Sequence, residues 1–88
     1  MSYGWLAPAL ARAQEETAAD KNPAVSVAAG ELFDSLRAWS MSATVSPQAQ
    51  VSLQARVDTL AKHVGPAPVA GTFSTELLDL ARRALEKA

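Results

Sequence analysis

Prolines paired with capping residues divide this chain into segments more sharply than any other feature. Asn22-Pro23 and Ser46-Pro47 each combine a good N-cap with a proline at the first helical position, where the missing N–H costs nothing. Gly65-Pro66 is a strong stop, because glycine adopts the left-handed conformation and proline prevents continuation. With Ser74 read as a further N-cap, these signals predict four short helices. Their approximate ranges are 6–19, 24–43, 47–64 and 75–87.

Apolar residues recur at helical spacing within these segments. In the second segment the stripe consists of Val25, Ala29, Leu32, Leu36, Trp39 and Ala43. Spacings of three and four are typical of one buried helix face, and no segment shows the alternation of a strand. Short connections favour antiparallel neighbours. The sequence therefore predicts an all-α fold, a compact antiparallel bundle of about four short helices that forms a single domain over residues 1–88.

Two positions in the second segment leave structural questions open. Gly30 lies inside the predicted helix, where glycine costs about 1 kcal/mol relative to alanine. It marks either a close helix crossing or a break that splits the segment in two. Trp39 belongs to the apolar stripe, so its indole either fills the core or anchors a partner.

Composition narrows the possible functions. The formal net charge is −1, so the chain lacks the basic field that nucleic-acid binding needs, and we expect no nucleic-acid partner. No apolar run is long enough to cross a bilayer, and the first residues lack the pattern of a secretion signal. We therefore expect a cytoplasmic protein with no membrane partner. Its 19 alanines and proline-capped helices suggest a bacterial source.

Few residues are available for chemistry. The chain has no cysteine, and His63 is its single histidine, which cannot build a typical zinc site alone. His63 lies in the last turn of the third predicted helix, where a protonated imidazole interacts favourably with the helix dipole. The acidic residues are scattered. We therefore expect no metal, no cofactor and no enzymatic activity.

One short motif suggests a different function. Asp34-Ser35-Leu36, preceded by Glu31-Leu32, resembles the Asp-Ser-Leu site of acyl and peptidyl carrier proteins. Those carriers are also four-helix domains of about this length. The resemblance implies that Ser35 carries a phosphopantetheine arm. The alternative is a solvent-facing Asp-Ser pair on an amphipathic helix.

Apolar residues that a small bundle cannot easily hide carry the leading functional hypothesis. Aromatic residues and methionine are enriched at protein interfaces, and Val69 lies in the longest predicted loop. The candidate anchors are Tyr3, Trp5, Val27, Trp39 and Met41. We predict a small protein–protein interaction module, either an adaptor, a regulator or inhibitor, or an assembly subunit. It would act by helix-face docking to a partner protein or to a second copy of itself, as a homodimer.

Overall fold

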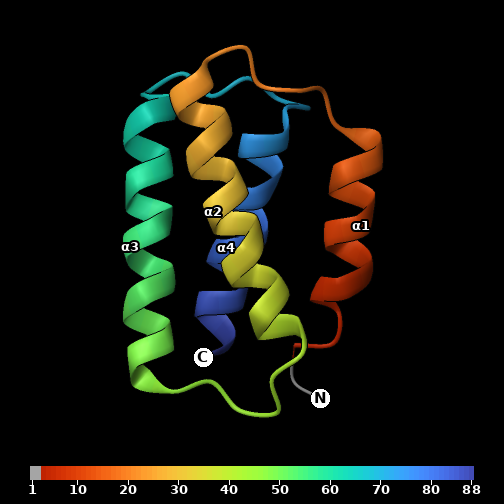
Figure 1. Ribbon diagram of the computed structural model, residues 1–88, viewed down its shortest axis with the longest axis vertical. Coiled ribbons are helices and arrows are strands. Elements are labelled where there is room, and N and C mark those ends of the chain that lie inside the picture. Colours follow the sequence, from red (N-terminus) through yellow and green to blue (C-terminus); the bar gives the residue numbers. More distant parts are fainter. Residues whose placement is uncertain (1–2) are drawn as a thin grey trace.

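The computed structural model describes residues 3–88 and shows four helices. They are α1 (Leu6–Glu16), α2 (Pro23–Ser40), α3 (Pro47–Val64) and α4 (Phe73–Lys87). Consecutive helices run in opposite directions, as Figure 1 shows. The radius of gyration is 12.2 Å, close to the roughly 12 Å expected for a compact chain of this length. The prediction of an all-α antiparallel bundle is confirmed.

The helices pack around one hydrophobic core. Both α2 and α4 contact every other helix, whereas α1 and α3 do not contact each other in the described part of the chain. In Figure 1, α2 lies in front of α4, with α3 and α1 on either side. The apolar stripes supply the core, and its leucines are Leu6, Leu10, Leu32, Leu36, Leu53, Leu60, Leu77, Leu78 and Leu80.

The capping signals act as expected in the middle of the chain. The Ala24 N–H donates to the Asn22 side chain at 2.9 Å, and the Ala49 N–H donates to Ser46 Oγ at 3.1 Å. Gly65 ends α3 with a φ of 82°, a conformation that favours glycine. As a result, α3 has the predicted bounds.

Three helix ends differ from the prediction by two residues or more, and α2 begins one residue earlier than predicted, at Pro23. The first helix stops at Glu16 rather than at residue 19, because Thr17 is extended and Ala18 pairs with the α3–α4 connection. The second stops at Ser40 rather than at residue 43, where the Ser40 and Ser42 hydroxyls donate to carbonyls of the last turn.

The fourth helix begins at Phe73, two residues earlier than predicted, and Ser74 lies inside the helix rather than at its cap. The chain before α4 gives it no side-chain cap of its own. Its first N–H groups are instead bound by the α1–α2 connection.

Gly30 does not break the second helix. It lies on an exposed side of a continuous α2, and a Cβ added there would meet no atom within 4 Å. Gly30 therefore marks neither a break nor a close helix crossing.

Candidate functional site

Two of the predicted anchors belong to the core. Tyr3 is 5% exposed and Trp39 is 4% exposed. Their rings meet edge to face, with centroids 5.1 Å apart, an arrangement that stabilises aromatic pairs. The question left open for Trp39 is thereby answered: its indole packs inside the bundle. Neither side chain is available to a partner on the surface of the folded protein.

Trp5 has an intermediate position. It is half-buried and packs against the core, and the Lys87 ammonium lies 5.5 Å from its ring centroid. The indole Nε1 is buried and finds no hydrogen-bond partner among the described residues. Trp5 therefore ties the start of α1 to the end of α4.

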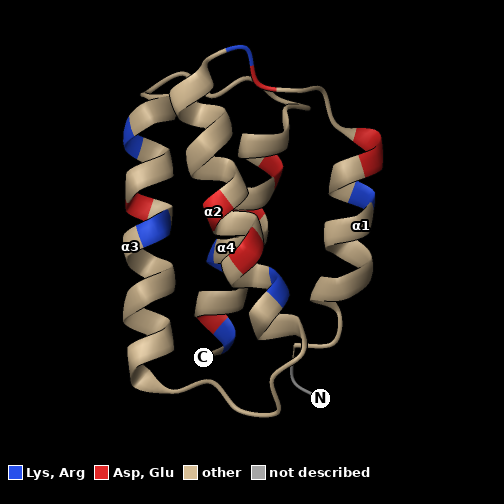
Figure 2. Ribbon diagram, viewed as in Figure 1, with Lys and Arg blue, Asp and Glu red and all other residues tan. Residues whose placement is uncertain are grey.

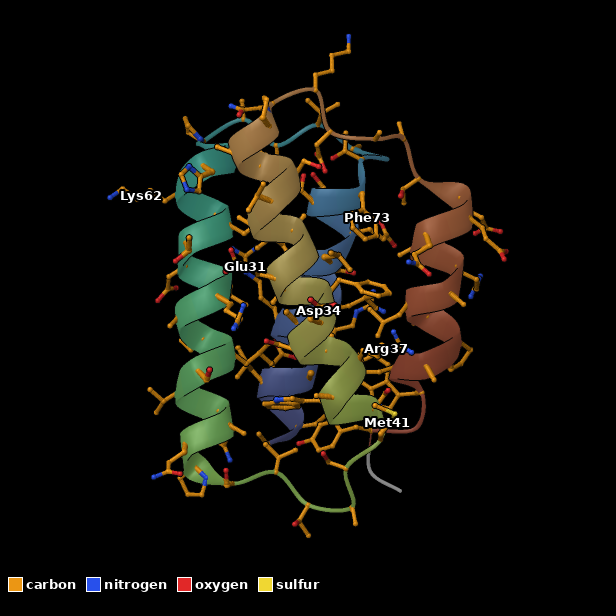
Figure 3. The ribbon with its side chains drawn as sticks, viewed as in Figure 1. Glu31, Asp34, Arg37, Met41, Lys62 and Phe73 are labelled. Atoms are coloured by element: carbon orange, nitrogen blue, oxygen red, sulfur yellow. The ribbon has the colours of Figure 1, made fainter. Side chains whose placement is uncertain are left out.

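Val27 and Met41 are on the surface, as expected, with 64% and 69% of each residue exposed. They lie on the same side of α2 but are 14 residues apart, which corresponds to about 21 Å along a helix. Charged Glu31 and Asp34 lie between them in the sequence, and Figure 3 shows both on α2 above Met41. Both signs of charge are interspersed on the helices (Figure 2), and Glu31 itself pairs with Arg56 of α3 at 3.3 Å. The structure therefore does not bring Val27 and Met41 together into one apolar patch.

Ser35, the candidate attachment residue of the carrier hypothesis, lies in the middle of α2 and is half-buried. It is two turns after buried Ala28 and therefore shares its side of the helix. No contact around Ser35 favours a phosphopantetheine arm, and the carrier hypothesis stays a prediction.

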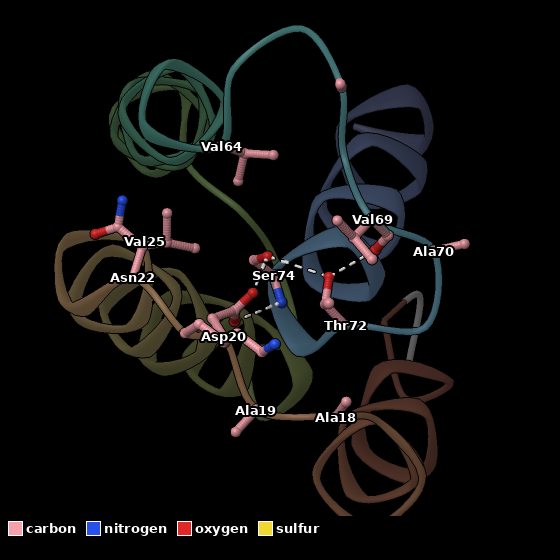
Figure 4. Close-up of a pocket in the computed structure, with 12 residues that line it drawn as sticks. Ala18, Ala19, Asp20, Asn22, Val25, Val64, Val69, Ala70, Thr72 and Ser74 are labelled. Carbon is pink, nitrogen blue, oxygen red and sulfur yellow. Dashed lines mark hydrogen bonds between the residues drawn. The ribbon is translucent and has the colours of Figure 1, made fainter.

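A cavity lies at one end of the bundle, where the α1–α2 and α3–α4 connections meet (Figure 4). Its volume is about 390 Å³, within the usual range for binding pockets. The walls are mostly apolar. They comprise Val25, Val64, Val69 and the alanines 18, 19, 67 and 70, whereas Asp20, Lys21, Asn22, Thr72 and Ser74 supply the polar atoms. We call this cavity the loop-end pocket.

Backbone hydrogen bonds join the two connections that form the pocket. The Ala18 N–H donates to the Gly71 carbonyl at 2.9 Å, and the Phe73 N–H donates back to the Ala18 carbonyl at 3.0 Å. These bonds make a short parallel bridge between Ala18 and Thr72. The pocket is therefore held by long-range pairing and does not depend on one flexible loop.

Asp20 and Ser74 provide a second long-range contact at the base of the pocket. The Ser74 N–H donates to Asp20 Oδ2 at 3.1 Å, and the Ser74 hydroxyl donates to Asp20 Oδ1 at 2.5 Å. Ser74 is only 2% exposed, so the carboxylate points inward. Thr72 Oγ1 lies 3.5 Å from Ser74 Oγ and donates to the Val69 carbonyl at 2.8 Å. Figure 4 shows this chain of bonds crossing the pocket.

Sequence reasoning identified only one part of this site. It placed Val69 in a loop, and the structure shows it 66% exposed at the pocket. The sequence predicts Ser74 as a local cap, and Asp20 lies between the first two predicted helices. No local pattern could reveal their pairing, because 54 residues separate them.

Residues outside the loop-end pocket are weaker candidates for a functional site. Among residues 3–88 no three His, Asp or Glu side chains are grouped so that they could hold a metal ion. No helix in that range combines the length and apolar character needed to span a bilayer. His63 is exposed near the end of α3.

No family model matches this chain, and comparison with curated proteins and with solved structures gives no significant match.

Proposed function

We propose that this chain is a small helical protein–protein interaction module that receives a side chain of a partner protein in the loop-end pocket. The observation that carries the proposal is the pocket itself, an apolar cavity of about 390 Å³ with the exposed Val69 beside it. Concave apolar sites with few polar groups are the usual place for a binding anchor. The proposal keeps the predicted class of function but moves docking from a helix face to the end of the bundle.

The chemistry of the lining favours binding. Asp20 and Ser74 form hydrogen bonds that join the α1–α2 connection to the start of α4, and the Thr72 hydroxyl is bound within the α3–α4 connection. The valine and alanine walls offer apolar surface, and full burial of one aliphatic side chain contributes about 1.5–3 kcal/mol. One anchor therefore gives modest affinity, which neighbouring contacts of the partner would raise. We place this adaptor or regulator in the cytoplasm, and the alanine-rich composition favours a bacterial source.

A blocked pocket tests the proposal. Peptides are selected from a display library on the wild-type protein, and their affinities are then measured for Ala70→Trp. Ala70 is exposed at the pocket, so the large indole would occupy the opening without entering the core. We expect Ala70→Trp to weaken binding at least about tenfold, since it removes an anchor worth about 1.5–3 kcal/mol.

The matched control is Ala43→Trp, an exposed alanine in the connection at the other end of the bundle. It should bind the selected peptides as the wild type does, and circular dichroism should show both variants folded. Peptides that bind Ala70→Trp as tightly as the wild type would refute the proposed site. Sedimentation equilibrium over a range of concentrations, with both variants, decides whether a second copy is the partner.

A further inference from the structure

We propose that the side chain that the loop-end pocket takes is a lysine of the partner protein, an inference that rests on the proposed function. Two features of the pocket together indicate a lysine. The walls are aliphatic, and a carboxylate lies at their base. A lysine side chain has the same order of groups, with an apolar stem of four methylenes and an ammonium at its tip.

The apolar walls of the loop-end pocket match the methylene stem of a lysine side chain. Val25 from α2, Val64 from the last turn of α3 and Val69 from the α3–α4 connection line the pocket from different elements. Figure 4 shows these side chains around the space beside Asp20 and Ser74. A methylene chain between them buries apolar surface on several sides and exposes no polar atom to the valines.

The Asp20 carboxylate fits the ammonium. Each of its oxygens accepts one hydrogen bond from Ser74, and an ionised carboxylate has sites for about four. No Lys, Arg or His in the described residues places a nitrogen within 4 Å of this carboxylate. Its charge is therefore met only by the Ser74 donors at the start of α4, and acceptor sites remain for a cation that enters the pocket.

Lysine suits this carboxylate better than arginine. A guanidinium binds best when two parallel N–H groups meet both carboxylate oxygens along a free edge. Ser74 already donates to both oxygens of Asp20, from its N–H and its hydroxyl. An ammonium needs only one free acceptor site and can rotate its three donors to reach it.

The charge of Lys21 competes with the ammonium of an incoming lysine. Lys21 is exposed and also lines the pocket, but it makes no ion pair with Asp20. Its positive charge opposes the entry of a second cation. Removal of this charge should strengthen lysine binding, which gives a variant whose effect is opposite in sign to that of Asp20.

Three blocked amino acids test the inference directly: the N-acetyl methylamides of lysine, of Nε-acetyl-lysine and of norleucine. Binding is followed by NMR titration of the methyl groups of Val25, Val64 and Val69. We expect the lysine probe to bind at least about fivefold more tightly than the two uncharged probes, because only it forms a charge-assisted bond with Asp20. Uncharged probes that bind as tightly as lysine would overturn the inference.

Two variants test whether the charges of Asp20 and Lys21 determine the preference for the lysine probe. Asp20→Asn keeps the shape and both contacts with Ser74, since the serine hydroxyl can accept as well as donate, but it removes the charge. It should abolish the preference for lysine, and Lys21→Gln should increase it. A preference that survives Asp20→Asn would overturn the inference. If no probe shifts the valine methyls while selected peptides remain sensitive to Ala70→Trp, the lysine inference fails and the proposed function stands.

Discussion

Two glycines of this protein have open space where a Cβ would be but differ in backbone conformation. Gly30 and Gly65 illustrate the contrast. Gly30 has helical neighbours on both sides and open space where a Cβ would be, whereas Gly65 ends α3 at a φ of 82°. The first glycine therefore carries only an entropic cost, and the second is needed for its backbone conformation.

Gly30→Ala should raise the free energy of unfolding by about 1 kcal/mol, because alanine restricts the unfolded chain and favours the helix. Urea denaturation followed by circular dichroism measures the change. Gly65→Ala is the control and should lower stability, since a side chain is strained at that positive φ. A loss of stability in Gly30→Ala would mean that the exposed side of α2 is covered in solution.

At the level of elements, the helices differ in where their caps come from. α2 and α3 are capped by the residue just before them, Asn22 and Ser46. α4 receives its caps from the α1–α2 connection, through Ala18 and through Asp20, which is 54 residues before Ser74. A helix capped in this way depends on the assembled bundle, whereas a locally capped helix can begin to form before the bundle does.

Asp20→Ala should lower the free energy of unfolding by about 1–2 kcal/mol, because it removes the acceptor for an N–H and a hydroxyl of buried Ser74. Ser46→Ala removes a local cap of α3 and should cost about 1 kcal/mol, which makes it the matched comparison. Thermal and urea denaturation measure both. Unchanged stability in Asp20→Ala would contradict the role of Asp20 as the cap of α4.

For the whole molecule, one core supports all four helices. Leu60 of α3 is fully buried, whereas Val51 of the same helix is 71% exposed. The apolar content of the chain is 49%, but much of it is alanine, so a few large side chains carry the packing. Loss of one of them affects the whole bundle.

Leu60→Ala should therefore lower the free energy of unfolding by about 2–5 kcal/mol, from lost burial and the cavity left behind. Val51→Ala should change it by less than about 0.5 kcal/mol, because little surface is lost at an exposed helix position. Equilibrium denaturation with two probes, circular dichroism and tryptophan fluorescence, measures both changes. Equal effects at the two positions would contradict the packing described for α3.

Local sequence signals predict the number and order of helices, the all-α class, both bounds of α3 and the surface positions of Val27, Met41 and Val69. These features follow from interactions within a few residues: caps, proline and glycine stops, and apolar spacing. Three features come from the packing of the helices: the pairing of Tyr3 with Trp39 in the core, the start of α4 at Phe73, and the contact between Asp20 and Ser74 beneath the loop-end pocket. Those features join residues from distant parts of the chain, so no local pattern records them, and they exist only once the helices have packed.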